Sequence, residues 1–131
     1  MGYSWYTSRD RVMAVVGASR NREKWGYKLY TFFKGYYRKA YPVNPKALTI
    51  DGDVVYPNLS SLPELPDFID VVVPPKVTLK VLEEAHVLGI RRVWLQPGSE
   101  DDEVLERCKG LGLECIHGKC LMEIIISHRD P

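Results

Sequence analysis

The stretch "RVMAVVGASRNREKWGYKL", residues 11–29, predicts a buried strand, a glycine turn and a helix in direct succession. Its first part, 11–18, is apolar without alternation, which is typical of a strand covered on both faces. From Trp25 onward large apolar residues recur with helical spacing, at Leu29, Phe32, Phe33 and Tyr36. A strand that passes through a glycine loop into a helix is the first unit of a nucleotide-binding α/β fold.

The same alternation continues along the chain. Further strands are expected in "KAYPVNPKA" (39–47), "FIDVVVPP" (68–75), "RRVWLQPG" (91–98) and "LECIHG" (113–118). One helical stripe runs from Val77 to Leu88 and ends at Gly89, and a second helix is expected to start with Ser99 as its N-cap. This alternation predicts a three-layer, Rossmann-like α/β fold: a doubly wound parallel sheet of about five strands, order 3-2-1-4-5.

Two segments interrupt the pattern. Residues 48–66 are punctuated by glycine and proline, and the Asp51-Gly52 pair predicts a tight turn or small hairpin. Residues 119–126, "KCLMEIII", are apolar enough for either a helix or a strand. This tail either completes the core or makes a homodimer contact, and the sequence leaves both readings open.

Composition narrows the class of protein. A chain of 131 residues suits one domain, so we expect a single domain over 1–131 with residues 1–10 as an N-terminal extension. The net charge of +1 gives no global reason to bind nucleic acid. There is no leader-like start and no apolar run near the roughly 20 residues of a membrane helix, so a cytoplasmic protein with no membrane partner is expected. Three cysteines, an odd number, suit a reducing compartment.

The unusual residues follow the predicted strands. In open α/β sheets, ligands bind outside the carboxyl ends of the strands. Each segment alone is typical of an ordinary turn, but four such segments at the same edge of the sheet predict a ligand site. The four segments are Gly17-Ala18-Ser19, Pro42-Val43-Asn44-Pro45-Lys46, Val73-Pro74-Pro75-Lys76 and Gln96-Pro97-Gly98.

The first of these loops has the chemistry of a phosphate site. Gly17 lets the backbone approach a phosphate, Ser19 and nearby N–H groups can donate to its oxygens, and the helix start adds partial positive charge. Full positive charges follow at Arg20, Arg22, Lys24 and Lys28. A solvated basic loop is the competing interpretation.

The end of the second strand distinguishes between ligands. A domain that binds NAD needs an acidic residue about 20 residues past the glycine loop, whereas a ligand with a ribose phosphate needs a cation there. The sequence offers Asn44-Pro45-Lys46, which disfavours NAD and leaves NADP and coenzyme A. The missing second and third glycines of the dinucleotide fingerprint count against NADP.

These motifs together resemble a known family. In order and spacing they are similar to the small standalone CoA-binding proteins, whose domain is related to the N-terminal part of the succinyl-CoA synthetase alpha subunit. The likeness covers roughly residues 10–127. It is carried by "VVGASRNREKWGYKL", "YPVNPK", "DVVVPPK...VLEEA", "VWLQPGSE" and "KCLMEI".

The resemblance implies a role for each matching position. Gly17, Ala18, Ser19 and Arg20 match the loop that holds the CoA phosphates, and Lys46 matches a ligand-contacting lysine. Val73, Pro74 and Pro75 match the segment beside the adenine. Leu95, Gln96 and Pro97 match the loop after the fourth strand, and Lys24 and Gly26 match a Lys-x-Gly of the standalone group. With Pro42, Asn44, Pro45 and Gly98 at the rim, these residues form the candidate site.

No catalytic constellation accompanies the site. The histidines, His86, His117 and His128, lie outside any matching context. The expected function is therefore non-catalytic binding of coenzyme A or an acyl-CoA. The alternatives are an NADP-binding oxidoreductase fragment and an accessory CoA-binding subunit of an acyl-CoA ligase.

The cysteines suggest two further interpretations. Cys115-x-His117-x-x-Cys120 supplies three ligands and no complete tetrahedral set, so no metal site is expected. Cys108, on an apolar helix face, reads as a small buried hydrophobe. Because CoA carries a thiol, a cysteine near its pantetheine end could form a mixed disulfide with it, and Cys120 is the best candidate.

Overall fold

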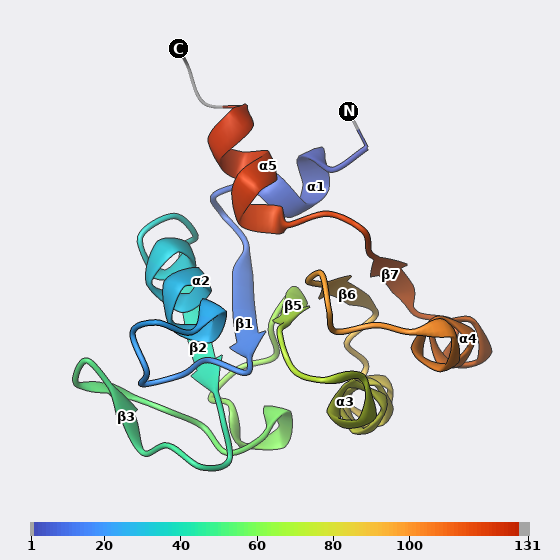
Figure 1. Cartoon of the computed structure of the whole chain (residues 1–131), viewed down its shortest axis with the longest axis horizontal. Helices are drawn as coiled ribbons and strands as arrows, with labels where there is room; N and C mark the ends of the chain where they lie inside the picture. Colours follow the sequence, from blue (N-terminus) through green and yellow to red (C-terminus); the bar gives the residue numbers. More distant parts are fainter. Residues whose placement is uncertain (1, 129–131) are drawn as a thin grey trace.

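A computed structural model describes residues 2–128 and shows a five-stranded, entirely parallel sheet (Figure 1). The strand order is β2-β1-β5-β6-β7, and a separate pair, β3 and β4, lies outside the sheet. The predicted α/β class and the Rossmann-like parallel sheet are confirmed. The strands are β1 (Val12–Val16), β2 (Lys39–Val43), β5 (Phe68–Val71), β6 (Arg92–Leu95) and β7 (Glu114–Ile116).

The predicted strand order is wrong in one respect. Order 3-2-1-4-5 places the third strand outside the second, whereas β5 pairs with β1 on its other side. Proline lacks an N–H and is confined to edge strands or special positions, so Pro42 already favours an edge place for β2. The observed order puts the carboxyl ends of β1 and β5 side by side, which is the switch point where ligands bind.

Helices cover both faces of the sheet (Figure 1). On one face, α1 (Ser4–Thr7), α2 (Trp25–Lys34) and α5 (Leu121–Ser127) share a core with Met13 and Val15 of β1. On the other, α3 (Pro75–Leu88) and α4 (Asp102–Leu111) pack with alternate residues of the same strand. Burial on both faces explains why β1 is apolar without alternation.

The two ends of the described chain are packed into the fold. Tyr6 in α1 is buried, and its hydroxyl donates a hydrogen bond of 2.6 Å to Glu114 of β7. The apolar tail forms α5, which buries Leu121 and Ile125 against the sheet. The tail thus completes the core, as one of the two sequence readings proposed.

The start of α4 differs from the prediction. Asp101, not Ser99, is the N-cap, and its carboxylate accepts a hydrogen bond of 2.9 Å from the backbone N–H of Val104. The buried Ser99 hydroxyl instead donates to the backbone carbonyl of Val71 at 2.9 Å. Ser99 therefore fastens the loop after β6 to the end of β5.

Cys108 is not the isolated hydrophobe that its helical position suggests. It forms a disulfide with Cys115, and their Cα atoms lie 6.4 Å apart. The reason is local: α4 ends at Gly112, whose left-handed backbone turns the chain straight back into β7. Cys120 is the free cysteine of the three.

The predicted turn at Asp51-Gly52 is confirmed. Both residues have positive φ, 49° and 85°, and they join β3 (Thr49–Ile50) to β4 (Asp53–Val54). A 3₁₀ turn, η1 (Leu59–Ser61), follows before β5. The path from β2 to β5 is therefore a hairpin excursion without a crossover α-helix.

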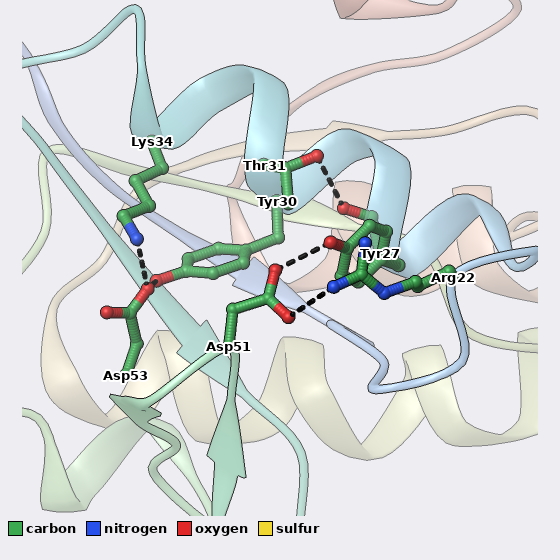
Figure 2. A network of polar contacts seen from close by, with 7 residues as sticks. All are labelled: Arg22, Tyr27, Tyr30, Thr31, Lys34, Asp51 and Asp53. Atoms are coloured by element: carbon green, nitrogen blue, oxygen red, sulfur yellow. Dashed lines mark hydrogen bonds and ion pairs between the residues drawn. The ribbon is translucent and has the colours of Figure 1, made fainter.

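Polar contacts fasten this hairpin to α2 (Figure 2). Tyr27 donates to the carboxylate of Asp51 at 2.6 Å, and Tyr30 donates to that of Asp53 at 2.7 Å. Lys34 pairs with Asp53 at 2.6 Å, and this contact is the main cause that lowers the pKa of the Asp53 carboxyl. Helix α2 and the hairpin thus form one unit beside the loop that joins β1 to α2.

Candidate ligand-binding cleft

A cleft of about 680 Å³ opens at the carboxyl ends of β1, β2 and β5. This is the location that the parallel topology predicts for a ligand. A volume of this size is typical of sites for small molecules and cofactors. The structure brings together on its walls most of the candidate residues from three strand ends: Gly17, Ser19, Lys24, Gly26, Asn44, Pro45, Lys46, Val73 and Pro74.

Two glycines allow the loop between β1 and α2 to pack closely against neighbouring backbone. A Cβ on Gly17 would overlap the backbone carbonyl of Val72, and the φ of Gly17 is 105°. A Cβ on Gly26 would overlap the carbonyl oxygen of Gly17 and crowd the N–H of Ser19. Gly26 therefore does for this loop what the last glycine does in the dinucleotide fingerprint, which is to let the helix approach the strand.

The loop between β1 and α2 is ordered by its own side chains. The Ser19 hydroxyl accepts a hydrogen bond of 3.0 Å from the N–H of Asn21, and the Asn21 side chain accepts one of 3.0 Å from the N–H of Glu23. A serine hydroxyl that accepts in this way keeps a proton to donate to an anionic oxygen. Trp25 and Gly26, the first two residues of α2, also line the cleft, and the first N–H groups of a helix have no partners within the helix.

Asn44 joins two walls of the cleft. Its side-chain amide donates to the carbonyl of Ala18 at 2.7 Å, and its side-chain oxygen accepts from the N–H of Lys46 at 2.8 Å. The side chain thus connects the loop after β1 to the loop after β2. Asn44 is a positioning residue that fixes the backbone on which Lys46 is carried.

The cations divide into two groups. Lys24 and Lys46 are exposed and line the cleft. Arg22 instead pairs with Asp51 at 3.3 Å (Figure 2), and the Lys28 ammonium lies 5.2 Å from the centre of the Trp25 ring. Arg20 is exposed outside the cleft lining. The positive charge available at the cleft wall therefore comes from the two lysines.

The opposite wall is apolar with one carboxylate. Val77 and Val81 of α3 and Leu59 of η1 provide its surface. Glu84 also lines it, and its two oxygens accept from the N–H groups of Leu59 at 3.2 Å and Ser60 at 3.1 Å. This carboxylate therefore stabilises the 3₁₀ turn, and the two N–H dipoles partly balance its negative charge.

The loop after β6 lies outside this cleft. Gln96 and Pro97 line a second cavity of about 190 Å³, together with Cys120 and Glu123 of the last segment. The two cavities share Trp25 and Val72 in their walls. The remaining candidate residues do not line either cavity: Ala18, Arg20, Pro42, Pro75, Leu95 and Gly98. Ala18 and Leu95 are fully buried, so their role is to pack the strand ends.

Several cleft residues were missed from the sequence. Glu23, Pro57, Asn58, Leu59 and Glu84 all line the cleft. The residues at 57–59 follow the β3–β4 hairpin, in the segment that the sequence shows only as punctuated by glycine and proline. Trp25 is 55% exposed and lines both cavities. A large exposed aromatic at a helix start beside a glycine loop was the available signal.

Among residues 2–128, no group of three or more His, Cys, Asp or Glu side chains is arranged to hold a metal ion. Within the same range, no helix combines the length and apolarity needed to cross a bilayer.

Comparison with known proteins identifies the family. A family model described as a CoA binding domain matches residues 11–125. The chain belongs to this CoA-binding-domain family. The match contains every strand of the main sheet and the whole cleft.

Curated relatives are larger proteins that contain a similar region. An ADP-forming acetate–CoA ligase of Methanocaldococcus jannaschii is 35% identical over 86 residues, which are 66% of this chain and 12% of the ligase. The alpha subunit of an ADP-forming acetate–CoA ligase II of Pyrococcus furiosus is 28% identical over 127 residues, 88% of this chain and 28% of the subunit. The chain thus spans well under half of either relative.

Solved structures include chains of similar extent. A conserved hypothetical protein from Pyrococcus furiosus superposes with a TM-score of 0.81 at 38% identity, covering 87% of this chain and 98% of the other. A hypothetical protein from Pyrococcus horikoshii gives a TM-score of 0.84 at 28% identity, covering 93% and 86%. The fold and the resemblance seen in the sequence are therefore confirmed.

Proposed function

We propose that this CoA-binding-domain protein binds coenzyme A or an acyl-CoA without covalent bonds in the cleft at the ends of β1, β2 and β5. The observation that carries the proposal is the convergence of three segments on one cavity: the Gly17–Ser19 loop with the start of α2, the Asn44–Lys46 segment, and Val72–Pro74. Family membership supports the same ligand.

Each part of the cleft suits one part of this ligand. The diphosphate is assigned to the Gly17–Ser19 loop, where N–H groups, the Ser19 hydroxyl and the start of α2 meet. Lys46 is assigned to the ribose phosphate, because it stands on the loop where an NAD-binding domain would carry an acidic residue. Val73 and Pro74 provide an apolar edge for the adenine.

We propose that this binding is non-catalytic. The ionisable side chains on the cleft wall are Glu23, Lys24, Lys46 and Glu84, and Glu84 is already held by two backbone N–H groups. The lysines provide affinity for phosphate.

The role of Lys46 is tested by replacing it with alanine. Loss of a charge-assisted contact to a partly desolvated phosphate should weaken CoA binding by about 1 to 3 kcal/mol. The matched control is Lys109→Ala, which removes an exposed lysine of α4 that does not line the cleft. This variant should bind CoA as the unaltered protein does. Calorimetric titration of both variants decides the matter. Equal affinity in the two variants would remove Lys46 from the site.

Cys120 provides a second prediction. It is partly exposed in the smaller cavity, to which we assign the pantetheine end because this cavity adjoins the main cleft at Trp25 and Val72. Attack of its thiolate on the disulfide of oxidised CoA would form a protein–CoA disulfide and release one CoA thiol. Intact-mass measurement after incubation with oxidised CoA should show one adduct that dithiothreitol removes. Cys120→Ser should give none, and unmodified protein in both samples would rule out the reaction.

A further inference from the structure

The cavity of about 190 Å³ beside the main cleft is not used by any phosphate, ribose or adenine in the proposed function. It lies between α2, the end of β5, the loop after β6 and the start of α5. Cofactor sites commonly exceed 300 Å³, so this space is too small for a second nucleotide. It shares Trp25 and Val72 with the main cleft, so a ligand that crosses Trp25 can reach both.

The walls of this cavity are mainly apolar. Leu29 lies at its inner side and is fully buried, and Val72 is half-buried. The Trp25 indole and the Pro97 ring stand on the exposed sides. Surfaces of this kind favour an apolar group that leaves water.

Both ends of the buried Gln96 amide have hydrogen-bond partners within the protein, so this side chain does not need a ligand as a partner. Its nitrogen donates to the sulfur of Cys120 at 3.2 Å, and its oxygen accepts from the N–H of Leu121 at 3.1 Å. The side chain is 4% exposed, and both ends are engaged. Gln96 thus fixes the loop after β6 against α5 and shapes the cavity.

The charge at this cavity comes from Glu123. Its side chain is exposed on α5, and the cavity lining includes no lysine or arginine, whereas the exposed Lys119 lines an adjoining hollow together with the same Glu123. A carboxylate on a ligand would meet a like charge here with no cation among the lining residues to compensate it. Repulsion of this kind is a recognised means of rejecting a competing ligand.

We infer that this cavity is the subsite for the acyl group of an acyl-CoA, and that it selects short, uncharged acyl chains over acyl chains ending in a carboxylate. The inference rests on the proposed function, because it places the nucleotide in the main cleft and the thioester end past Trp25. Burial of each added methylene should strengthen binding by about threefold to fourfold until the space is filled. Glu123 is the residue that sets the charge preference.

The experiment compares four ligands by calorimetric titration: CoA, acetyl-CoA, butyryl-CoA and succinyl-CoA. The unaltered protein should bind butyryl-CoA about tenfold more tightly than acetyl-CoA, since two methylenes are added. It should bind succinyl-CoA at least about tenfold more weakly than butyryl-CoA, a difference of about 1.4 kcal/mol. Glu123→Gln should narrow the gap between these two ligands. Glu106→Gln, on exposed α4 surface, is the matched control and should not narrow it.

The outcomes distinguish failure of the acyl-subsite inference from failure of the proposed function. If CoA binds but all acyl-CoA ligands bind with the same affinity, the subsite inference is wrong and the proposed function stands. The same holds if succinyl-CoA binds Glu123→Gln as weakly, relative to butyryl-CoA, as it binds the unaltered protein. If CoA itself does not bind, the proposed function fails first.

Discussion

Gly26→Ala is expected to weaken CoA binding and to destabilise the fold at the same time. The added methyl group would overlap the carbonyl oxygen of Gly17, which is backbone and cannot rotate away. The start of α2 must then move away from the end of β1. Overpacking of this kind costs about 1 to 3 kcal/mol of stability. Misalignment of the loop N–H groups should cost a further 1 to 3 kcal/mol, roughly, in binding.

Gly110→Ala is the matched control for this substitution. Gly110 lies inside α4, and no atom lies within 4 Å of a Cβ built on it. Alanine is favoured over glycine in a helix by up to about 1 kcal/mol, so this variant should be slightly more stable and should bind CoA normally. Chemical denaturation and calorimetric titration measure both properties. A Gly26→Ala protein that matches the unaltered chain in both would show that the close approach at Gly17 is unimportant.

Asp70→Asn is expected to change how stability depends on pH. Asp70 lies on the central strand β5, is fully buried, and neither of its carboxyl oxygens has a hydrogen-bond partner among residues 2–128. Burial raises the pKa of this carboxyl well above its ordinary value. A carboxyl with a raised pKa in the folded state takes up a proton on folding. The contribution of Asp70 to the free energy of unfolding should therefore be greatest at and below the ordinary aspartate pKa and fall as the pH rises toward its raised pKa, by up to about 1.4 kcal/mol per pH unit.

The amide of asparagine has nearly the same shape and does not ionise. The Asp70→Asn protein should lose the part of the pH dependence that belongs to this group, and at pH 8 it should be more stable than the unaltered chain by about 1 to 3 kcal/mol. Urea denaturation at pH 5 and pH 8 measures both quantities. Parallel pH profiles, or a variant that is less stable at pH 8, would contradict this account of Asp70.

The elements that depend on local pattern could be predicted from the sequence. The apolar run in β1, the helical spacing after Trp25 and the turn at Asp51-Gly52 each specify their own conformation through nearby residues. The order of the strands depends on pairings between distant segments. Pro42 is a local sign that β2 belongs at an edge, but the predicted order 3-2-1-4-5 follows the usual order of a glycine-loop fold.

The residues of the candidate site also divide into those that local sequence reveals and those that depend on contacts between distant segments. Gly17, Ser19 and Lys46 were found because their chemistry is visible beside a strand end. Glu84 was not, because it lies in the middle of α3 and reaches the cleft only through its contacts with η1. The engagement of Arg22 by Asp51 was also hidden, since it depends on the hairpin folding back onto α2.

The pairing of the cysteines depends on how the chain reverses. An odd number of cysteines argues against a fully paired disulfide framework, and Cys120 is free, but Cys108 and Cys115 are joined. Their pairing follows from the turn at Gly112, which places the first residues of β7 against the last turn of α4. The same geometry leaves Cys120 free beside the smaller cavity.

Calorimetric titration of the unaltered protein with CoA, dephospho-CoA, NADP and NAD tests the central claim most directly. CoA should bind, and dephospho-CoA should bind more weakly because Lys46 loses its phosphate. NAD should show no detectable binding, since the loop after β2 offers Asn44 and Lys46 in place of an acidic residue. Tighter binding of NADP than of CoA would contradict the account.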